Sequence, residues 1–392
     1  MTTGPAFDTI VVGLGAMGSA AAWQLARRGR SVLGIDRWTP PHPHGSTHGE
    51  TRITRQAIGE GEHYTPFALR SHELWREIEA ATGDDLLTLT GGLIISGPGA
   101  DATVHVPGFL ETTVAAARRY GIAHEVLDAR EIRRRFPAFA VRDEETGYYE
   151  PGAGFVRPER CVGAQLRLAE RLGATLRFGE RVLEVRPDGA GVLVRTDATR
   201  YLAERAVLTA GPWLPELLGP PLARHFTVTR QVLYWFAPSG PVEPFLPERF
   251  PVFIWEPAGL PEGIYGFPAV DGAAGGVKVA SAAYGAPTDP DSAMREVTAE
   301  EIARMYQTLV APCFPGLGAR CVKATTCLYT VTPDAGFVID RHPEHDGIIL
   351  VSPCSGHGFK HSAAVGEAVA EWVTEGRSRL DLTPFGLTRL ER

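Results

Sequence analysis

The sequence predicts an α/β fold with an α+β insertion: a Rossmann-like doubly wound domain that receives an inserted domain built on an antiparallel sheet. Two observations predict it. Strand and helix patterns alternate near both ends of the chain, at 7–36 and 336–373, whereas 226–281 contains successive strands without helices between them. With 392 residues, the chain is long enough for two domains.

The first unit, residues 7–36, carries a glycine pattern between two strands. Gly13, Gly15 and Gly18 follow the first strand with GxGxxG spacing, and the second strand ends at Asp36. Gly13 permits a tight turn, Gly15 lets the backbone approach a pyrophosphate, and Gly18 allows close packing of the helix on the strand. The helix N-terminus would hold the phosphates, and Asp36 the ribose hydroxyls. The unit predicts a dinucleotide site, without distinguishing NAD from FAD.

The later elements set the expected division of the chain. Helical periodicity is present at 65–81, 158–173 and 297–310, and strand patterns at 86–97 (a glycine-broken pair), 175–209, 226–281, 336–340 and 347–351. Regular βαβ units do not continue after the first, so we expect a discontinuous dinucleotide domain at 1–90, 150–215 and 320–392, and a substrate domain at 91–149 and 216–319.

Composition bounds the function. A net charge of −7 argues against nucleic-acid or anionic-membrane partners. The five cysteines include no C-x-x-C pair, which fits a reducing compartment and no structural zinc. There is no signal-peptide pattern and no apolar run of about 18 residues. We therefore expect a cytoplasmic protein that does not enter a membrane and holds no metal.

Lysine is rare in this chain. Only Lys278, Lys323 and Lys360 occur among 39 basic residues. Arginine does not readily lose its proton, and its fork is wider than an ammonium group. Positions that retain lysine are therefore candidates for a specific role, although three lysines could also remain by chance.

Two polar loops could bind an anion. The loop 44–55 contains Arg52 and Arg55, which can project to one side if the segment is helical. The alternative is a solvated basic face, or ion pairs with Glu50 and Glu60. In the loop 354–362, two glycines flank His357 and would let a flat or phosphorylated ligand approach the backbone, close to Lys360.

Several strand residues could belong either to a site or to the core. Lys278 lies between apolar residues, on an exposed strand face or beside a redox ring. Tyr265 and Tyr329 are more often core aromatics than site residues. In KATTCLYTVTPD, positions 323, 325, 327 and 329 share one strand face. Taken alone, Cys327 is a small buried hydrophobe.

Together these motifs resemble the monomeric sarcosine oxidase and N-methyltryptophan oxidase family of D-amino-acid-oxidase-like flavoproteins. The resemblance extends from DTIVVGLGAMGSAAA through PPHPHGSTHGETRITR, LTAGPW, TRQVLYWF, IYGFP and CLYTVTPDAGFVID to SGHGFKHS and DLTPFGLTRL. It implies an FAD-dependent oxidase that demethylates sarcosine and related N-methyl amino acids with O2 and water, giving the amino acid, formaldehyde and hydrogen peroxide. It also implies a monomer.

The resemblance assigns roles to individual residues. It implies FAD contacts from Gly13, Gly15, Met17, Gly18, Asp36, Ser46, Thr51, Val182, Cys327, Gly356, Gly358 and Lys360. Cys327 would form a thioether to the flavin 8α-methyl group, Arg52 would pack on a flavin face, and Lys278 would promote oxygen reduction. Arg55 and Lys360 would hold the substrate carboxylate, Tyr265 and Tyr329 would line the substrate site, and His48 would lie near the ring.

One position departs from the family pattern. Relatives that oxidise sarcosine carry a histidine where this chain has Ala282. The freed space could admit a bulkier substrate, such as N-methyltryptophan, or a cyclic one, such as proline or pipecolate. Two further alternatives are a dehydrogenase that uses another electron acceptor, which Lys278 argues against, and a non-catalytic FAD-binding module, which the cationic residues argue against.

Overall fold

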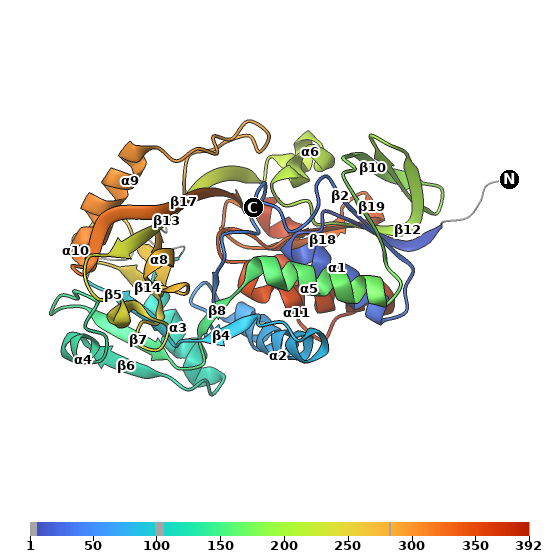
Figure 1. Cartoon of the computed structure of the whole chain (residues 1–392). Helices are drawn as coiled ribbons and strands as arrows, with labels where there is room; N and C mark the ends of the chain where they lie inside the picture. Colours follow the sequence, from blue (N-terminus) through green and yellow to red (C-terminus); the bar gives the residue numbers. More distant parts are fainter. Residues whose placement is uncertain (1–5, 99–105, 282–283, 392) are drawn as a thin grey trace.

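The computed structural model describes residues 6–98, 106–281 and 284–391. Two large sheets stand beside each other (Figure 1) and confirm the predicted mixed α/β class. The described strands of the first sheet are β1 (Phe7–Val12), β2 (Val32–Asp36), β9 (Thr175–Phe178), β10 (Val182–Asp188), β11 (Gly191–Thr196), β12 (Arg200–Leu208), β18 (Val338–His342) and β19 (His345–Ser352). Its centre is parallel, in the order β9, β2, β1, β12, and β19 also runs parallel to β12.

Four long helices accompany the first sheet: α1 (Ala16–Arg27), α2 (Thr65–Thr82), α5 (Pro158–Arg171) and α11 (Ser362–Glu375). Figure 1 shows α1, α5 and α11 close together, although they come from the start, middle and end of the chain. Small residues permit this packing. A Cβ added at Gly366 of α11 would lie 2.4 Å from the Cβ of Ala20 in α1.

The second sheet contains the expected antiparallel strands. In spatial order its described strands are β17 (Leu317–Val331), β13 (Thr227–Pro238), β16 (Val277–Ser281), β15 (Ile264–Phe267), β14 (Val252–Glu256), β5 (Gly92–Ser96), β7 (Thr146–Glu150) and β6 (Glu125–Asp128). Only β14 and β5 pair in parallel. The helices on this side are α3 (Phe109–Arg119), α4 (Ala129–Arg135), α9 (Ala299–Met305), a π-helix at Tyr306–Val310 and α10 (Ala311–Cys313).

A small third sheet joins β3 (Arg52–Thr54), β8 (Gly154–Val156) and β4 (Leu87–Leu89). The strands expected as a pair at 86–97 therefore separate, because β4 pairs with β8 while β5 pairs with β14 and β7. The remaining short helices are α6 (Leu214–Leu218), α7 (Pro220–Ala223) and α8 (Gly272–Gly275), with 3-10 turns at Glu62–Tyr64, Gly211–Trp213, Glu243–Phe245, Phe359–His361, Thr383–Phe385 and Leu387–Glu391.

The domain boundary expected at residue 320 falls inside β17. That strand pairs with β13 of the second sheet from Leu317 to Val331. We therefore propose that this boundary lies after Val331. The other expected boundaries remain predictions.

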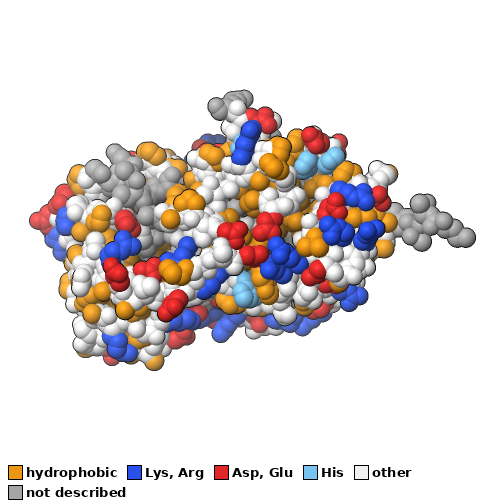
Figure 2. Space-filling model, turned by 90° about the horizontal axis from the view of Figure 1, so that it is seen from above, with side chains coloured by type: hydrophobic (Ala, Val, Ile, Leu, Met, Phe, Trp, Pro, Cys, Tyr) orange, Lys and Arg blue, Asp and Glu red, His pale blue; other side chains and the backbone are white. Residues whose placement is uncertain are grey.

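The surface carries mixed charge. Figure 2 shows acidic and basic side chains interspersed on the face it presents. Within the described ranges, no helix has the length and apolar character needed to cross a membrane.

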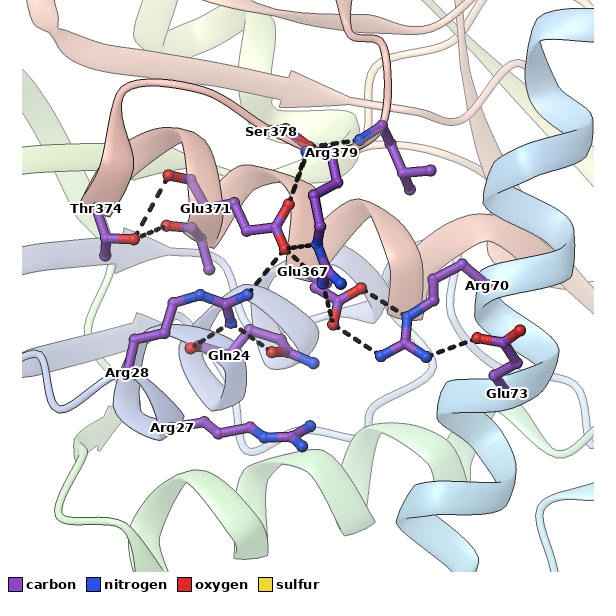
Figure 3. Close-up of polar contacts among 12 residues, drawn as sticks. Gln24, Arg27, Arg28, Arg70, Glu73, Glu367, Glu371, Thr374, Ser378 and Arg379 are labelled. Carbon is purple, nitrogen blue, oxygen red and sulfur yellow. Dashed lines mark hydrogen bonds and ion pairs between the residues drawn. The ribbon is translucent and has the colours of Figure 1, made fainter.

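A carboxylate network ties α11 to the neighbouring helices (Figure 3). Arg70 of α2 binds Glu367 through two hydrogen bonds, of 2.8 Å from Nε and 2.9 Å from Nη2. Glu371, one turn further along α11, pairs with Arg28 after α1 and with Arg379 beyond α11. Burial opposes ionisation of Glu367, but the bonds to Arg70 outweigh it, so the pKa of Glu367 lies below its ordinary value. The network stabilises the helix layer while Glu367 is ionised.

We predict that Glu367→Gln lowers the free energy of unfolding by about 2 kcal/mol at neutral pH, because a hydrogen-bonded charge pair is broken. A lowered carboxyl pKa contributes stability that is complete above the ordinary glutamate pKa of 4.5 and is lost as pH falls through the folded value. The variant should therefore lose less stability than the wild type when urea unfolding is repeated at about pH 3.5.

Glu73→Gln is the matched control, because Glu73 also pairs with Arg70 but its side chain is 65% exposed. Its effect should stay within about 0.5 kcal/mol. Equal effects of the two substitutions would contradict the assigned importance of Glu367.

Candidate active site

Two cavities meet between the sheets. The first has a volume of about 1350 Å³, counting the space open at its mouth, and its lining includes Asp36 and Val182. The second has a volume of about 650 Å³ on the same basis. Arg52 and Tyr329 line both cavities, together with Gly356 and Phe359. A ligand that fills the first cavity can therefore present one end to the second.

The first cavity begins at the glycine turn before α1. Gly13 has a φ of +86°, and a Cβ there would lie 2.7 Å from the carbonyl oxygen of Thr209. Gly18 packs still more closely, since its Cβ would lie 1.8 Å from the carbonyl oxygen of Gly13. Gly15 lines the cavity and has no side chain to cap α1, while the amide of Ala16 donates to the Thr47 hydroxyl at 3.3 Å. The next amide groups of the first helical turn are thus available to an anion.

Asp36 occupies the end of β2. Its carboxylate accepts hydrogen bonds from the backbone amides of Leu14, at 2.7 Å, and Trp38, at 2.9 Å. These bonds hold the carboxylate against the glycine turn, where it lines the first cavity. The carboxylate keeps further acceptor capacity for hydroxyl groups of a ligand.

The loop between β2 and β3 covers the other part of the first cavity. Arg52 donates to the carbonyl oxygens of Thr51, at 2.9 Å, and Ser46, at 3.0 Å, which fixes its guanidinium where the cavities meet. Among the described residues, the Ser46 hydroxyl and His48 Nε2 are buried without a hydrogen-bond partner. Burial lowers the pKa of His48 to about 3, with Arg52 adding to the effect, so the imidazole is neutral at physiological pH.

One face of the second sheet presents several candidate residues together. Trp235 of β13 pairs directly with Lys278 of β16 on one side and with Lys323 of β17 on the other. Directly paired residues of antiparallel strands share a face. In β17, Cys327 and Tyr329 lie on the same face as Lys323, as the alternation predicted. The opposite face carries side chains such as Phe236 that pack into the core.

Lys278 is buried, with 1% exposure, so the alternative of an exposed strand face is wrong. Its ammonium donates to the carbonyl oxygens of Gly49 and Thr51, each at 2.8 Å, and to the Thr51 hydroxyl at 3.2 Å. The ammonium also lies 4.4 Å from the ring centre of Phe267 and 5.2 Å from that of Trp235. Burial, followed by the charge of Arg52, lowers the pKa of Lys278 well below its ordinary value.

Two tyrosines contribute to the second cavity. The hydroxyls of Tyr265 and Tyr329 lie 3.0 Å apart and share a hydrogen bond. Burial raises the pKa of Tyr265 to about 12 and that of Tyr329 well above its ordinary value, so both remain protonated. They offer the cavity neutral hydroxyl groups beside apolar side chains such as Ile254.

The second cavity holds a carboxylate of the protein itself. Glu60 forms an ion pair with Arg55, and its other oxygen lies 3.6 Å from the ammonium of Lys360. All three side chains are at most 5% exposed. Burial lowers the pKa of Lys360 to about 8, with Glu60 opposing and Arg55 adding to the effect. Arg55 and Lys360 therefore form a buried clamp that already binds one carboxylate.

The structure corrects one expectation about the arginine loop. Arg52 begins β3, so the helical arrangement that would project Arg52 and Arg55 to one side is wrong; pairing of β3 with β8 imposes the extended form. The solvated basic face is wrong as well, because Arg55 is 2% exposed. The ion pair with Glu60 was among the alternatives and is present.

The predicted cofactor residues separate into groups. Those that line the first cavity are Gly13, Gly15, Met17, Asp36, Ser46, Val182, Gly356 and Gly358. Gly18 packs α1, Thr51 binds Lys278, and Lys360 lines the second cavity. Cys327 is 1% exposed and is not among the described residues that line either cavity. Ala282, the departure from the family pattern, lies outside the described residues.

Sequence reasoning missed Trp235, Phe267 and Glu159 as neighbours of the site. The aromatic residues become recognisable only once the pairing of β13, β15 and β16 is known. Glu159, in the first turn of α5, accepts hydrogen bonds from the amides of Gly49 and Glu50. An acidic residue in the first turn of a helix is too common to have indicated this contact.

Comparison with known proteins shows which family the chain belongs to. Residues 8–372 match the family described as DAO, FAD dependent oxidoreductase. The chain belongs to this family. Monomeric sarcosine oxidase of Streptomyces avermitilis is 43% identical, over 98% of both proteins. N-methyl-L-tryptophan oxidase of Escherichia coli is 35% identical, over 98% of this chain and 100% of the relative.

Solved structures agree with this placement. The open form of NikD, an unusual amino acid oxidase essential for nikkomycin biosynthesis, is 26% identical and superposes with a TM-score of 0.80, over 97% of both chains. Glycine oxidase of Geobacillus kaustophilus, 21% identical with a TM-score of 0.76 over 98% of both chains, shares the fold. The resemblance to the sarcosine and N-methyltryptophan oxidases is confirmed.

The first cavity suits the FAD of this family. Gly15 and the first turn of α1 can receive the pyrophosphate, and Asp36 the ribose hydroxyls. The unpaired hydroxyl of Ser46 offers another polar contact. The flavin end would then lie near Arg52 and Tyr329, where the second cavity opens.

We predict that acetate binds the holoenzyme in the second cavity with a pH dependence set by Lys360. The clamp is cationic while Lys360 is protonated, so binding is tightest below a pH of about 8, the lowered pKa of Lys360. Above it the dissociation constant should rise about tenfold per pH unit, since one proton is linked to binding. Titration of the flavin absorbance with acetate between pH 6 and about 10 measures this dependence.

Lys360→Gln should weaken acetate binding at neutral pH and abolish the rise above pH 8. The same rise in the variant would show that another group titrates.

Proposed function

We propose that this FAD-dependent oxidoreductase oxidises sarcosine and related N-methyl amino acids. The reaction takes the N-methyl amino acid, O2 and water to the free amino acid, formaldehyde and hydrogen peroxide. The observation that supports it most directly is the buried clamp of Arg55 and Lys360, which binds the Glu60 carboxylate beside the junction of the two cavities. Relatives named for sarcosine and N-methyl-L-tryptophan oxidation support the substrate class.

Bound FAD would supply the redox chemistry for oxidising the carbon–nitrogen unit of the substrate, with O2 as the final electron acceptor. Arg55 and Lys360 bind the substrate carboxylate in place of Glu60, which orients the amine toward Arg52 and Tyr329. The cations also favour the neutral form of the amine, which must lose its proton before oxidation. His48 is neutral, so it adds no positive charge to that of Arg52 and Lys278.

Lys278 and Arg52 act in the second half of the reaction. A bound flavin would supply negative charge as electrons pass to O2, and Arg52 and Lys278 would stabilise that charge. Lys278 is held by backbone carbonyls without a directly bonded carboxylate, so its charge is not neutralised by contact. This arrangement favours O2 as the acceptor.

We further propose a thioether between Cys327 and the flavin 8α-methyl group. Its formation removes one hydrogen from the thiol and one from the methyl group, and O2 accepts the electrons. Cys327 lies two residues from Tyr329, on the sheet face that carries Lys278. Burial raises the pKa of the Cys327 thiol, while Arg52 and Lys278 oppose that effect and favour the thiolate.

We also propose a cytoplasmic monomer whose partners are an amino-acid substrate and O2. Dispersed cysteines support a reducing compartment, and the names of the sarcosine-oxidising relatives support the monomer.

We predict that the purified holoenzyme releases peroxide and formaldehyde together from sarcosine, N-methyl-L-alanine or N-methyl-L-tryptophan. L-Proline and L-pipecolate test the cyclic alternative, because they can give peroxide but no formaldehyde. Dimethylamine has the methylamine group without the carboxylate, so its kcat/KM should fall below that of sarcosine by about 10² or more. Absence of peroxide with every compound would contradict the oxidase proposal and favour a dehydrogenase with another electron acceptor or a non-catalytic module.

We predict that yellow colour stays with the protein after acid precipitation of the wild type and is released from Cys327→Ser. Cys354→Ser is the matched control, because Cys354 lines the first cavity and should leave the colour attached. Release from the Cys354 variant alone would move the tether to that residue. Release from the wild type would contradict a covalent link.

A further inference from the structure

The carbonyl groups that hold Lys278 belong to an unusual turn. Gly49 has a φ of +99° and Glu50 a φ of +72°, and the amide of Thr51 donates to the carbonyl of Gly49 at 2.8 Å. Positive φ is unfavourable for a residue such as glutamate, so contacts outside the turn must maintain it. Gly49 has no room for a side chain, because a Cβ would lie 2.7 Å from Leu233.

Glu159 binds the amide side of this turn. One oxygen of its carboxylate accepts from the amide of Gly49 at 2.6 Å and from that of Glu50 at 3.0 Å. The carbonyl oxygens of Gly49 and Thr51 face the other way and accept from Lys278. The turn therefore lies between a carboxylate and an ammonium, and its peptide dipoles align with both.

A second anchor holds the turn from the strand side. Lys323 of β17 forms an ion pair with Glu50, and its ammonium lies 5.0 Å from the ring centre of Trp235. Lys278 approaches the same ring. Two of the three lysines of the chain thus meet at Trp235, one buried and one 46% exposed at the side chain.

We propose that Glu159 is a positioning residue for Lys278, which it serves by fixing the turn Gly49–Thr51, and that the Lys323–Glu50 pair completes this support. The inference rests on the proposed role of Lys278 in the reaction with O2. Without Glu159, the turn loses the acceptor for two amides, and the carbonyl oxygens of Gly49 and Thr51 no longer stay aligned with the ammonium.

The charge around Lys278 is consistent with this role. The titratable and charged groups around it include Arg52, Cys327, Glu159, Glu50, His48 and Lys323, and also Arg157 and Asp271, which line the same small cavity. After burial, Arg52 lowers the pKa of Lys278, whereas Cys327, Glu159 and Glu50 raise it. The two glutamates act through the turn and not by direct hydrogen bonds, so they favour the ammonium without pairing with it.

Lysine labelled with 13C at Cε and 15N at Nζ would test the proposal directly. The chain has three lysines, so the spectrum contains three lysine side-chain signals. Each signal is assigned by its loss in a single-residue variant. A pH titration of the holoenzyme then reads the pKa of Lys278. Rapid mixing separately measures flavin reduction by substrate and reoxidation of the reduced enzyme by O2.

We predict that Glu159→Ala lowers the pKa of Lys278 by about 1 unit and slows reoxidation about tenfold, with flavin reduction unchanged within about twofold. Glu159→Gln keeps an oxygen that can accept from both amides and should restore reoxidation to within about threefold of the wild type. Glu50→Gln should lower the pKa of Lys278 and should slow reoxidation by about threefold. The effect is smaller because Glu159 still holds the turn. Glu170→Gln, on the exposed end of the same helix, is the control and should change nothing.

If Glu159→Ala changed neither the pKa of Lys278 nor the reoxidation rate, the proposal would be overturned. Equal slowing by the alanine and glutamine variants would also overturn it, because the loss would then follow the charge and not the position. If the Glu159→Ala variant does not fold, Glu50→Gln provides the test. An unchanged pKa of Lys278 in that variant would contradict the proposed role of the turn. Failure of Lys278→Met to slow reoxidation would instead refute the proposed role of Lys278, while the titration still tests Glu159.

Discussion

A buried ammonium group held only by uncharged oxygens is the interaction on which the site depends. Burial of Lys278 opposes its charge, and Arg52 opposes it further. The compensation comes from the carbonyl oxygens of Gly49 and Thr51, which a turn with positive φ points toward β16. A directly bonded carboxylate would stabilise the ion better, but it would also cancel the charge that we propose for the reaction with O2.

The same loop couples the two cavities. Arg52 follows the turn directly and stands where the dinucleotide cavity and the smaller cavity meet. Glu60 and Lys360 line the smaller cavity, and Glu60 also pairs with Arg55, which lines a neighbouring cavity, so both buried cations have an anionic partner. In the proposed function, a substrate carboxylate would exchange one anion for another at that position. The two cations would then stay paired in both states.

Much of the fold could be predicted, because its signals are local. The GxGxxG turn, the strand ending at Asp36 and the alternation at 323–329 each depend on neighbouring residues. The extended form of Arg52–Thr54 could not be predicted, because it is imposed by pairing with β8, a strand about a hundred residues further along the chain. The contact of Glu159 with Gly49 spans 110 residues, and Trp235 joins two lysines only through strand register. Such contacts are properties of the assembled sheet and not of any segment.

The packing of α1 against α11 has a consequence for the assembly of the first cavity. β1 rests against β12, and α1 rests against α11 where Gly366 meets Ala20. The cavity beside Gly13 is walled by Thr209 and Gly356, which lie about two hundred and more than three hundred residues further along the chain. The cavity is therefore complete only after these distant segments have folded onto β1 and α1.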